Sequence, residues 1–97
     1  MARNYDMEDA FAAALTHVER SLASGMKAAD GSSAQPQLAR LQLELKLQRD
    51  QARERGAVDH EWLQKTVRWV AEWVPEKEIT LIAALGRIVR AAPPALS

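Results

Sequence analysis

The amino-acid sequence predicts an all-α fold, a small four-helix bundle that we expect to be dimeric. Ala, Leu, Arg and Glu are abundant and β-branched residues are scarce outside the last third, a composition that favours helices over strands. Apolar residues recur at helical spacing, and prolines and glycines separate the periodic segments. A chain of 97 residues has room for one core, so we expect residues 1–97 to form a single domain.

The first helix is expected over residues 5–29. Asn4 can cap its start, because a short polar side chain accepts a hydrogen bond from the first turn. Gly25 offers an early stop, but Met26 continues the apolar pattern toward Gly31, and we place the end near residue 29. The apolar stripe of this helix consists of Met7, Phe11, Leu15, Val18 and Leu22.

A flexible loop is expected over residues 24–37, where small, polar and glycine residues predominate. The second helix then covers residues 36–55. Pro36 suits its first turn, and Gly56 suits its carboxyl-terminal cap.

The second helix contains the main ambiguity of the sequence. Leucines at 41, 43, 45 and 47 alternate with polar residues, as in a half-buried strand. All the residues of this segment are good helix formers, and no second strand-like run could pair with it, so we expect a helix. Leu43 and Leu47 then point away from a face made by Leu38, Leu41, Leu45 and Ala52.

The third helix is expected over residues 60–74, with Asp59 as its amino-terminal cap and Pro75 as its stop. Pro75 can also serve the first turn of a fourth helix over residues 76–91. Its apolar set is Leu81, Ile82, Leu85, Ile88 and Val89. The tail, residues 92–97, contains two prolines and is expected to be frayed.

Composition narrows the classes of partner and compartment. The 13 basic and 13 acidic residues balance, so no net field attracts nucleic acid or anionic lipid. Cysteine is absent, which removes disulfides and thiol chemistry. The polar, acidic start is unlike a signal peptide, and no segment approaches the ~20 apolar residues of a membrane span. We therefore expect a cytoplasmic protein without a membrane partner.

The most informative feature is a tryptophan stripe on the third helix. Trp62, Trp69 and Trp73 are separated by steps of seven and four, which places them on one line. Tryptophan is common both in cores and at interface hot spots, so the stripe is either core or interface. The sequence leaves both interpretations open.

Leu43 and Leu47 also indicate an interface, because two leucines outside the core face need other apolar groups to pack against. They can pack on the loop, on the same helix of a second copy, or on an amphipathic helix of a partner. We therefore expect a non-catalytic protein–protein interaction module, an adaptor, chaperone-like binder or inhibitor, that forms a homodimer. The expected contact residues are Trp62, Trp69, Trp73, Leu43 and Leu47, with Arg49, Arg53 and Lys65 as the basic rim.

No motif predicts an enzyme, a cofactor or a metal site. The two histidines, His17 and His60, lack a second ligand at helical metal-site spacing. The carboxylates are spread over helix starts and polar faces, and no nucleophile elbow or phosphate loop is present.

Two alternative functions are less well supported than a protein–protein interaction module. Helices three and four meet at Pro75 in the outline of a helix-turn-helix, with basic residues at Arg87 and Arg90, but Glu76 and Glu78 stand where a recognition helix reads bases. Nucleic-acid binding is therefore disfavoured.

The last alternative is a resemblance. His17, Arg20 and Ser21 are similar in spacing to the segment around the phosphate-accepting histidine of histidine phosphotransfer domains, which are helical bundles of about this size. The resemblance implies phosphoryl transfer at His17. It covers residues 17–21 only, and Glu19 stands where that family has an apolar residue.

Overall fold

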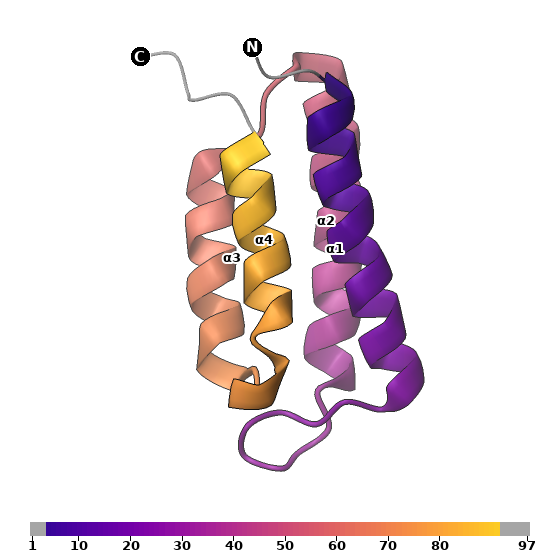
Figure 1. Ribbon diagram of the computed structural model, residues 1–97, viewed down its shortest axis with the longest axis vertical. Helices are drawn as coiled ribbons and strands as arrows, with labels where there is room; N and C mark the ends of the chain where they lie inside the picture. Colours follow the sequence, from indigo (N-terminus) through magenta and orange to yellow (C-terminus); the bar gives the residue numbers. More distant parts are fainter. Residues whose placement is uncertain (1–3, 92–97) are drawn as a thin grey trace.

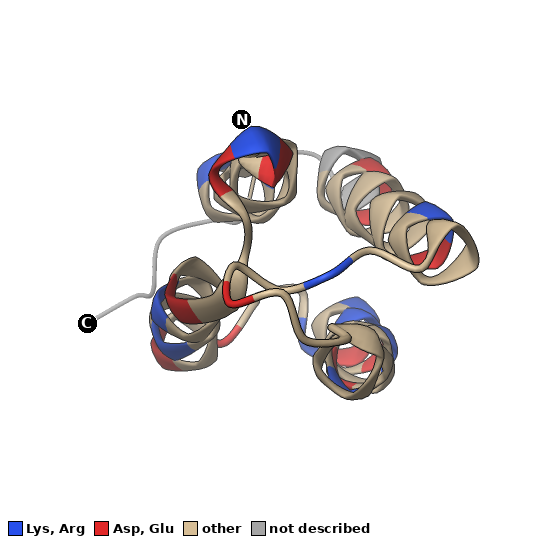
Figure 2. Cartoon of the chain, turned by 90° about the horizontal axis from the view of Figure 1, so that it is seen from below, with Lys and Arg blue, Asp and Glu red and all other residues tan. Residues whose placement is uncertain are grey.

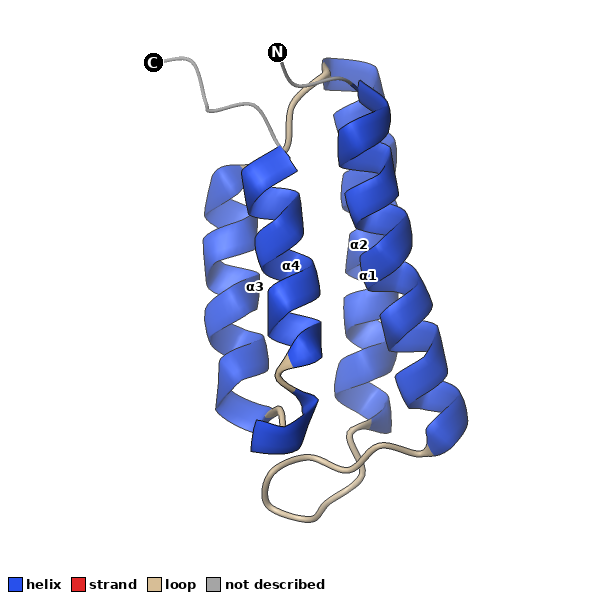
Figure 3. Ribbon diagram, in the orientation of Figure 1, coloured by secondary structure: helices blue, strands red, loops and turns tan. Residues whose placement is uncertain are grey.

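A computed structural model describes the backbone of residues 4–91 and the side chains of residues 7–91. Within this part of the chain the fold is all helical (Figure 3), as predicted. The expected tail at residues 92–97 and the side chain of Asn4 lie outside the described residues. The elements are α1 (Asn4–Ser24), α2 (Gln35–Arg55), α3 (His60–Trp73), the 3-10 turn η1 (Glu76–Glu78) and α4 (Thr80–Ala91).

The four α-helices run alternately down and up, and they occupy the corners of a square when viewed end-on (Figures 1 and 2). α1 packs closely against both α2 and α4, and α3 packs against α4. The fourth side, between α2 and α3, is the loosest, because the backbones of these helices stay further apart. Charged residues lie mainly on the outer faces of the helices (Figure 2).

The core is formed by one face of each helix. α1 contributes the predicted stripe, in which Met7, Phe11, Leu15 and Val18 are buried and Leu22 is partly buried. Burial of this apolar surface is the main source of stability in a chain of this size. The largest fully buried side chains are Phe11, Leu38, Leu41, Leu45, Leu63, Leu81, Leu85, Ile88, Val18 and Val70.

α1 ends at Ser24, so the expected continuation to residue 29 is wrong. Gly25 adopts a left-handed conformation with φ of 69°. The Gly25 amide donates to the Leu22 carbonyl at 3.2 Å, and the Met26 amide donates to the Ser21 carbonyl at 3.0 Å. This pair of bonds is a Schellman motif, which satisfies the last carbonyls and turns the chain away from the helix axis. Met26 still packs partly on the core, but from the loop.

α2 resolves the ambiguity of the alternating leucines in favour of a helix, as predicted. Pro36 lies in its first turn, and Gly56 ends it with φ of 72°, donating to the carbonyl of Ala52 at 2.7 Å. One face of α2 is buried, made by Leu38, Leu41, Leu45 and Ala52. Leu43 and Leu47 therefore point outward.

Asp59 caps α3 as predicted, since its carboxylate accepts a hydrogen bond from the Trp62 amide at 3.1 Å. The fourth predicted helix differs from the structure. Pro75 is extended, with ψ of 149°, and is followed by η1 before α4 begins at Thr80. The expectation of one continuous helix from residue 76 is therefore wrong, because the chain must reverse direction sharply after Pro75 before it can run back along α3.

The connection between α1 and α2 crosses the end of the bundle beneath α3 (Figure 2). Ala28 and Ala34 are buried within it, and the Ala29 amide donates to the Trp73 carbonyl at 2.7 Å. This bond satisfies a carbonyl at the end of α3, where no further helical donor follows. The loop thereby links α1 and α2 to the end of α3, and its mobility stays a prediction.

Two neighbouring leucines of α2 give a direct test of this packing. Leu45→Ala should lower the free energy of unfolding by about 3 kcal/mol, because it leaves a cavity in the core. Leu43→Ala should change it by less than about 0.5 kcal/mol at low protein concentration, because the side chain is exposed. Urea unfolding of both variants measures the difference, and equal losses would contradict the assignment of the two faces.

Candidate interaction surface

The three tryptophans of α3 divide between core and surface. Trp73 is only 8% exposed and belongs to the core, whereas Trp62 and Trp69 are half-buried. The rings of Trp69 and Trp73 meet edge to face, with centroids 5.4 Å apart. The core interpretation of the stripe therefore holds for Trp73, and the other two rings lie at the edge of the core toward α2.

Polar groups of α2 bind the two half-buried tryptophans. The indole nitrogen of Trp62 donates to Glu44 Oε1 at 2.9 Å. Arg40 Nε donates to Glu44 Oε2 at 2.7 Å, and the Arg40 guanidinium lies 5.0 Å from the centre of the Trp69 ring. Such a cation over an indole face is an attractive contact. We call Arg40, Glu44, Trp62 and Trp69 the α2–α3 seam.

Glu44 is the charged centre of the seam. Partial burial raises the pKa of its carboxyl group. Hydrogen bonds from Trp62 and Arg40, together with the charge of Arg40, lower the pKa by a larger amount. The net pKa lies below the ordinary value of 4.5. Glu44 is therefore an anion at neutral pH, stabilised by bonds that exist only in the folded chain.

A groove of about 300 Å³ opens over the seam. Two indole rings and the Arg40–Glu44 pair form most of its walls, together with Thr66 and Lys65. Lys65 pairs with Glu61 at 3.1 Å, and its side chain is largely exposed. The groove therefore offers two apolar rings and an ion pair for contact.

Leu43 and Leu47 form a second, separate surface, which we call the outer face of α2. Their side chains are 71% and 55% exposed, and they lie one helical turn apart. Glu44 points toward α3 while the two leucines point away from the bundle. The structure therefore does not bring these leucines together with the tryptophans.

The three basic residues expected as a rim are distributed over different surfaces. Arg49 pairs with Asp50 at 3.3 Å on α2. Arg53 pairs with Glu8 of α1 and also lies 3.6 Å from Asp50. Lys65 belongs to α3 and the groove. Sequence reasoning missed Arg40 and Glu44, although an Arg and a Glu four residues apart beside a buried stripe are a recognisable signal.

The residues behind the alternative functions are placed as follows. His17 Nε2 lies 3.3 Å from Thr80 Oγ1, so the ring spans α1 and α4. α3 and α4 lie side by side and antiparallel (Figure 1), without the steep crossing of a helix-turn-helix. Among the described residues, no three His, Cys, Asp or Glu side chains gather to hold a metal ion.

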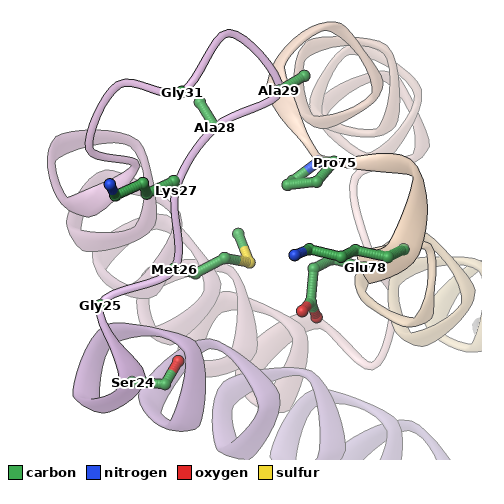
Figure 4. Close-up of a pocket in the computed structure, with 10 residues that line it drawn as sticks. Ser24, Gly25, Met26, Lys27, Ala28, Ala29, Gly31, Pro75 and Glu78 are labelled. Atoms are coloured by element: carbon green, nitrogen blue, oxygen red, sulfur yellow. The ribbon is translucent and has the colours of Figure 1, made fainter.

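A hollow of about 530 Å³ lies between the α1–α2 loop and the turn before α4. Met26 and Glu78 approach it from opposite sides, with Pro75 at its wall (Figure 4). Small residues and loop backbone form most of the remaining lining, including Gly25, Ala28 and Gly31.

No helix among residues 4–91 has the length and apolar character to cross a membrane. Comparison of the chain with protein-family models, curated proteins and solved structures finds no match.

The lowered pKa of Glu44 predicts a pH-dependent contribution to stability. A carboxyl group whose pKa is lower in the folded chain stabilises the fold above its ordinary pKa, and this contribution is lost as the pH falls through the folded pKa. The stability advantage of the wild type over Glu44→Gln should therefore shrink between about pH 6 and pH 3. Urea unfolding across this range measures it.

Glu72→Gln is the matched control, because it removes one carboxylate from the exposed outer face of α3. It corrects for the change in net charge. A difference between wild type and Glu44→Gln that stays constant with pH, after this correction, would contradict the role given to the Trp62 and Arg40 bonds.

Proposed function

We propose that this chain is a non-catalytic protein–protein interaction module that self-associates through the outer face of α2. The observation that carries the proposal is the exposure of Leu43 and Leu47, 71% and 55%, on the outside of an otherwise complete bundle. An adaptor, a chaperone-like binder or an inhibitor could each be built on such a module.

The energetics support a contact at this face. Burial of a leucine side chain contributes on the order of 2 kcal/mol, so two leucines from each of two copies give a useful driving force. The core does not depend on them, because Leu38, Leu41 and Leu45 fill it from the opposite face. The leucines are therefore available for a partner without any unfolding of the bundle.

The tryptophans contribute less to the proposed interface than the sequence suggested. Trp73 is covered by its own chain, and Trp62 already donates its indole hydrogen to Glu44. Trp69 carries the Arg40 guanidinium on its ring. We assign Trp62 and Trp69 to a secondary surface around the groove. The contact between two copies of the chain is assigned to Leu43 and Leu47.

Sedimentation velocity over a concentration series tests the proposal. The wild type should associate, and Leu43→Glu with Leu47→Glu should weaken association by at least about a hundredfold, because four buried leucines per dimer are replaced by charges. The variant should remain helical by circular dichroism, since neither residue belongs to the core.

Ile79→Glu with Ala83→Glu is the matched control. It places the same two charges at the same spacing at the start of α4, where Ile79, which directly precedes the helix, is 61% exposed and Ala83 is also exposed. This control should leave association unchanged. A monomeric wild type at all concentrations, or equal loss in both double variants, would overturn the proposal.

A further inference from the structure

We infer that two copies of this chain pair through α2 in antiparallel orientation, with Leu43 against the partner's Leu47 and Arg40 beside the partner's Asp50. The inference rests on the proposed function and adds to it the orientation of the contact and the charges that select it. The occupant of the outer face of α2 is therefore a second copy rather than an unrelated helix.

Six exposed residues follow one another along α2 at steps of four and three, the spacing of a coiled-coil contact. All six are exposed. We call them the outer stripe of α2, which consists of Pro36, Arg40, Leu43, Leu47, Asp50 and Glu54.

The charges along the outer stripe of α2 are not distributed symmetrically. The leucines lie at its centre, the positive Arg40 precedes them, and the negative Asp50 and Glu54 follow them. A two-fold axis at the level of Leu45 places each leucine against the other leucine of the partner. The same axis places Arg40 beside the partner's Asp50, twice per dimer.

A parallel pair gives the opposite result, because each position then meets its own copy. Arg40 would face the partner's Arg40, and both Asp50 and Glu54 would face themselves. In the antiparallel pair Glu54 lies beside the uncharged Pro36 of the partner. Two like-charge contacts remain near the axis, because Lys46 and Glu44 each approach their own copy. The exposed Lys46 side chain is long enough to turn away, and the Glu44 carboxylate is bonded to Arg40 and Trp62 of its own chain.

The two charged residues remain accessible in the monomer. The Arg40 side chain is 67% exposed although it bonds Glu44, and the Asp50 side chain is 61% exposed although it pairs with Arg49 and Arg53. Arg40 is also held in place, since its guanidinium rests on the Trp69 ring. The α2–α3 seam therefore orients the cation that the partner's Asp50 would meet.

The size of the stripe indicates a reversible dimer. One face of a single helix with two leucines is well below the ~800 Å² per partner of a standard stable interface. In such a small contact, exposed charge pairs select orientation more than they add affinity. Their effect should be visible when their signs are changed.

Charge exchange tests the orientation. Arg40→Asp alone and Asp50→Arg alone should each weaken the dimer by about tenfold, because attractive pairs become repulsive. The chain that carries both substitutions should recover most of the wild-type association, since each pair again joins opposite charges. In a parallel dimer the double variant would still place like charges together, so failure of this recovery would overturn the inference.

Disulfide trapping provides a second measurement that leaves the charges intact, and the chain has no cysteine to interfere. A mixture of Leu43→Cys and Leu47→Cys should form the mixed disulfide under mild oxidation, detected by intact mass. Each variant alone should form little. In the antiparallel pair, position 43 of one copy and position 47 of the other lie at the same height along the helix axis. Two copies of position 43 are instead offset by ~6 Å along the axis, which, added to the gap between the helices, takes their Cα atoms beyond the ~7 Å that a disulfide spans.

The possible failures are distinguishable. A wild type that never associates removes the proposed function and the inference together. Association that is lost in Leu43→Glu with Leu47→Glu but is trapped by each single cysteine variant keeps the proposed function and replaces the antiparallel orientation with a parallel one. Association without either disulfide pattern overturns the inference and places the contact on another part of the outer face.

Discussion

The structure depends on one constraint, the placement of leucines on two opposite faces of α2. A helix can turn only one of these faces toward a core, and here Leu38, Leu41 and Leu45 face inward. Leu43 and Leu47 must then face outward, in contact with water. The bundle is complete without them, so the same helix that supplies the core also leaves an apolar surface exposed. Fold and proposed function are thus two consequences of one sequence pattern.

The side of the bundle between α2 and α3 is its loosest side. α2 and α3 are joined mainly by long side chains, through the bonds of Glu44 with Trp62 and the contact of Arg40 with Trp69. At one end of this side the indole nitrogen of Trp73 and the amide oxygen of Gln37 are buried without a hydrogen-bond partner among the described residues. Buried polar groups without partners cost stability. The side is therefore held together less firmly than the α1–α2 and α1–α4 contacts.

Much of the fold could be predicted because its signals are local. Asp59 at the cap of α3, Gly56 after α2 and the apolar stripe of α1 each follow from rules about a few neighbouring residues. The identity of α2 as a helix followed from residue types, although its alternation suggested a strand. Local reasoning also located the two exposed leucines, because helical geometry alone separates them from the core face.

The errors occurred where distant parts of the chain decide the outcome. Gly25 and Gly31 were both plausible ends for α1, and the chain turns at Gly25, after which the loop bonds to the end of α3. The short turn at Glu76–Glu78 is set by the reversal after Pro75. Glu44 and Arg40 were missed because their partners, Trp62 and Trp69, are about twenty or more residues away and only the assembled bundle brings them together.

The most direct measurement of the central claim is a methyl spectrum of the leucines by nuclear magnetic resonance, recorded while the protein is concentrated. We expect the methyl signals of Leu43 and Leu47 to shift together with concentration while those of Leu41 and Leu45 stay constant, because only the outer face of α2 meets a second copy. Leu43 and Leu47 signals that do not change with concentration, or shifts confined to residues around Trp62 and Trp69, would contradict the account.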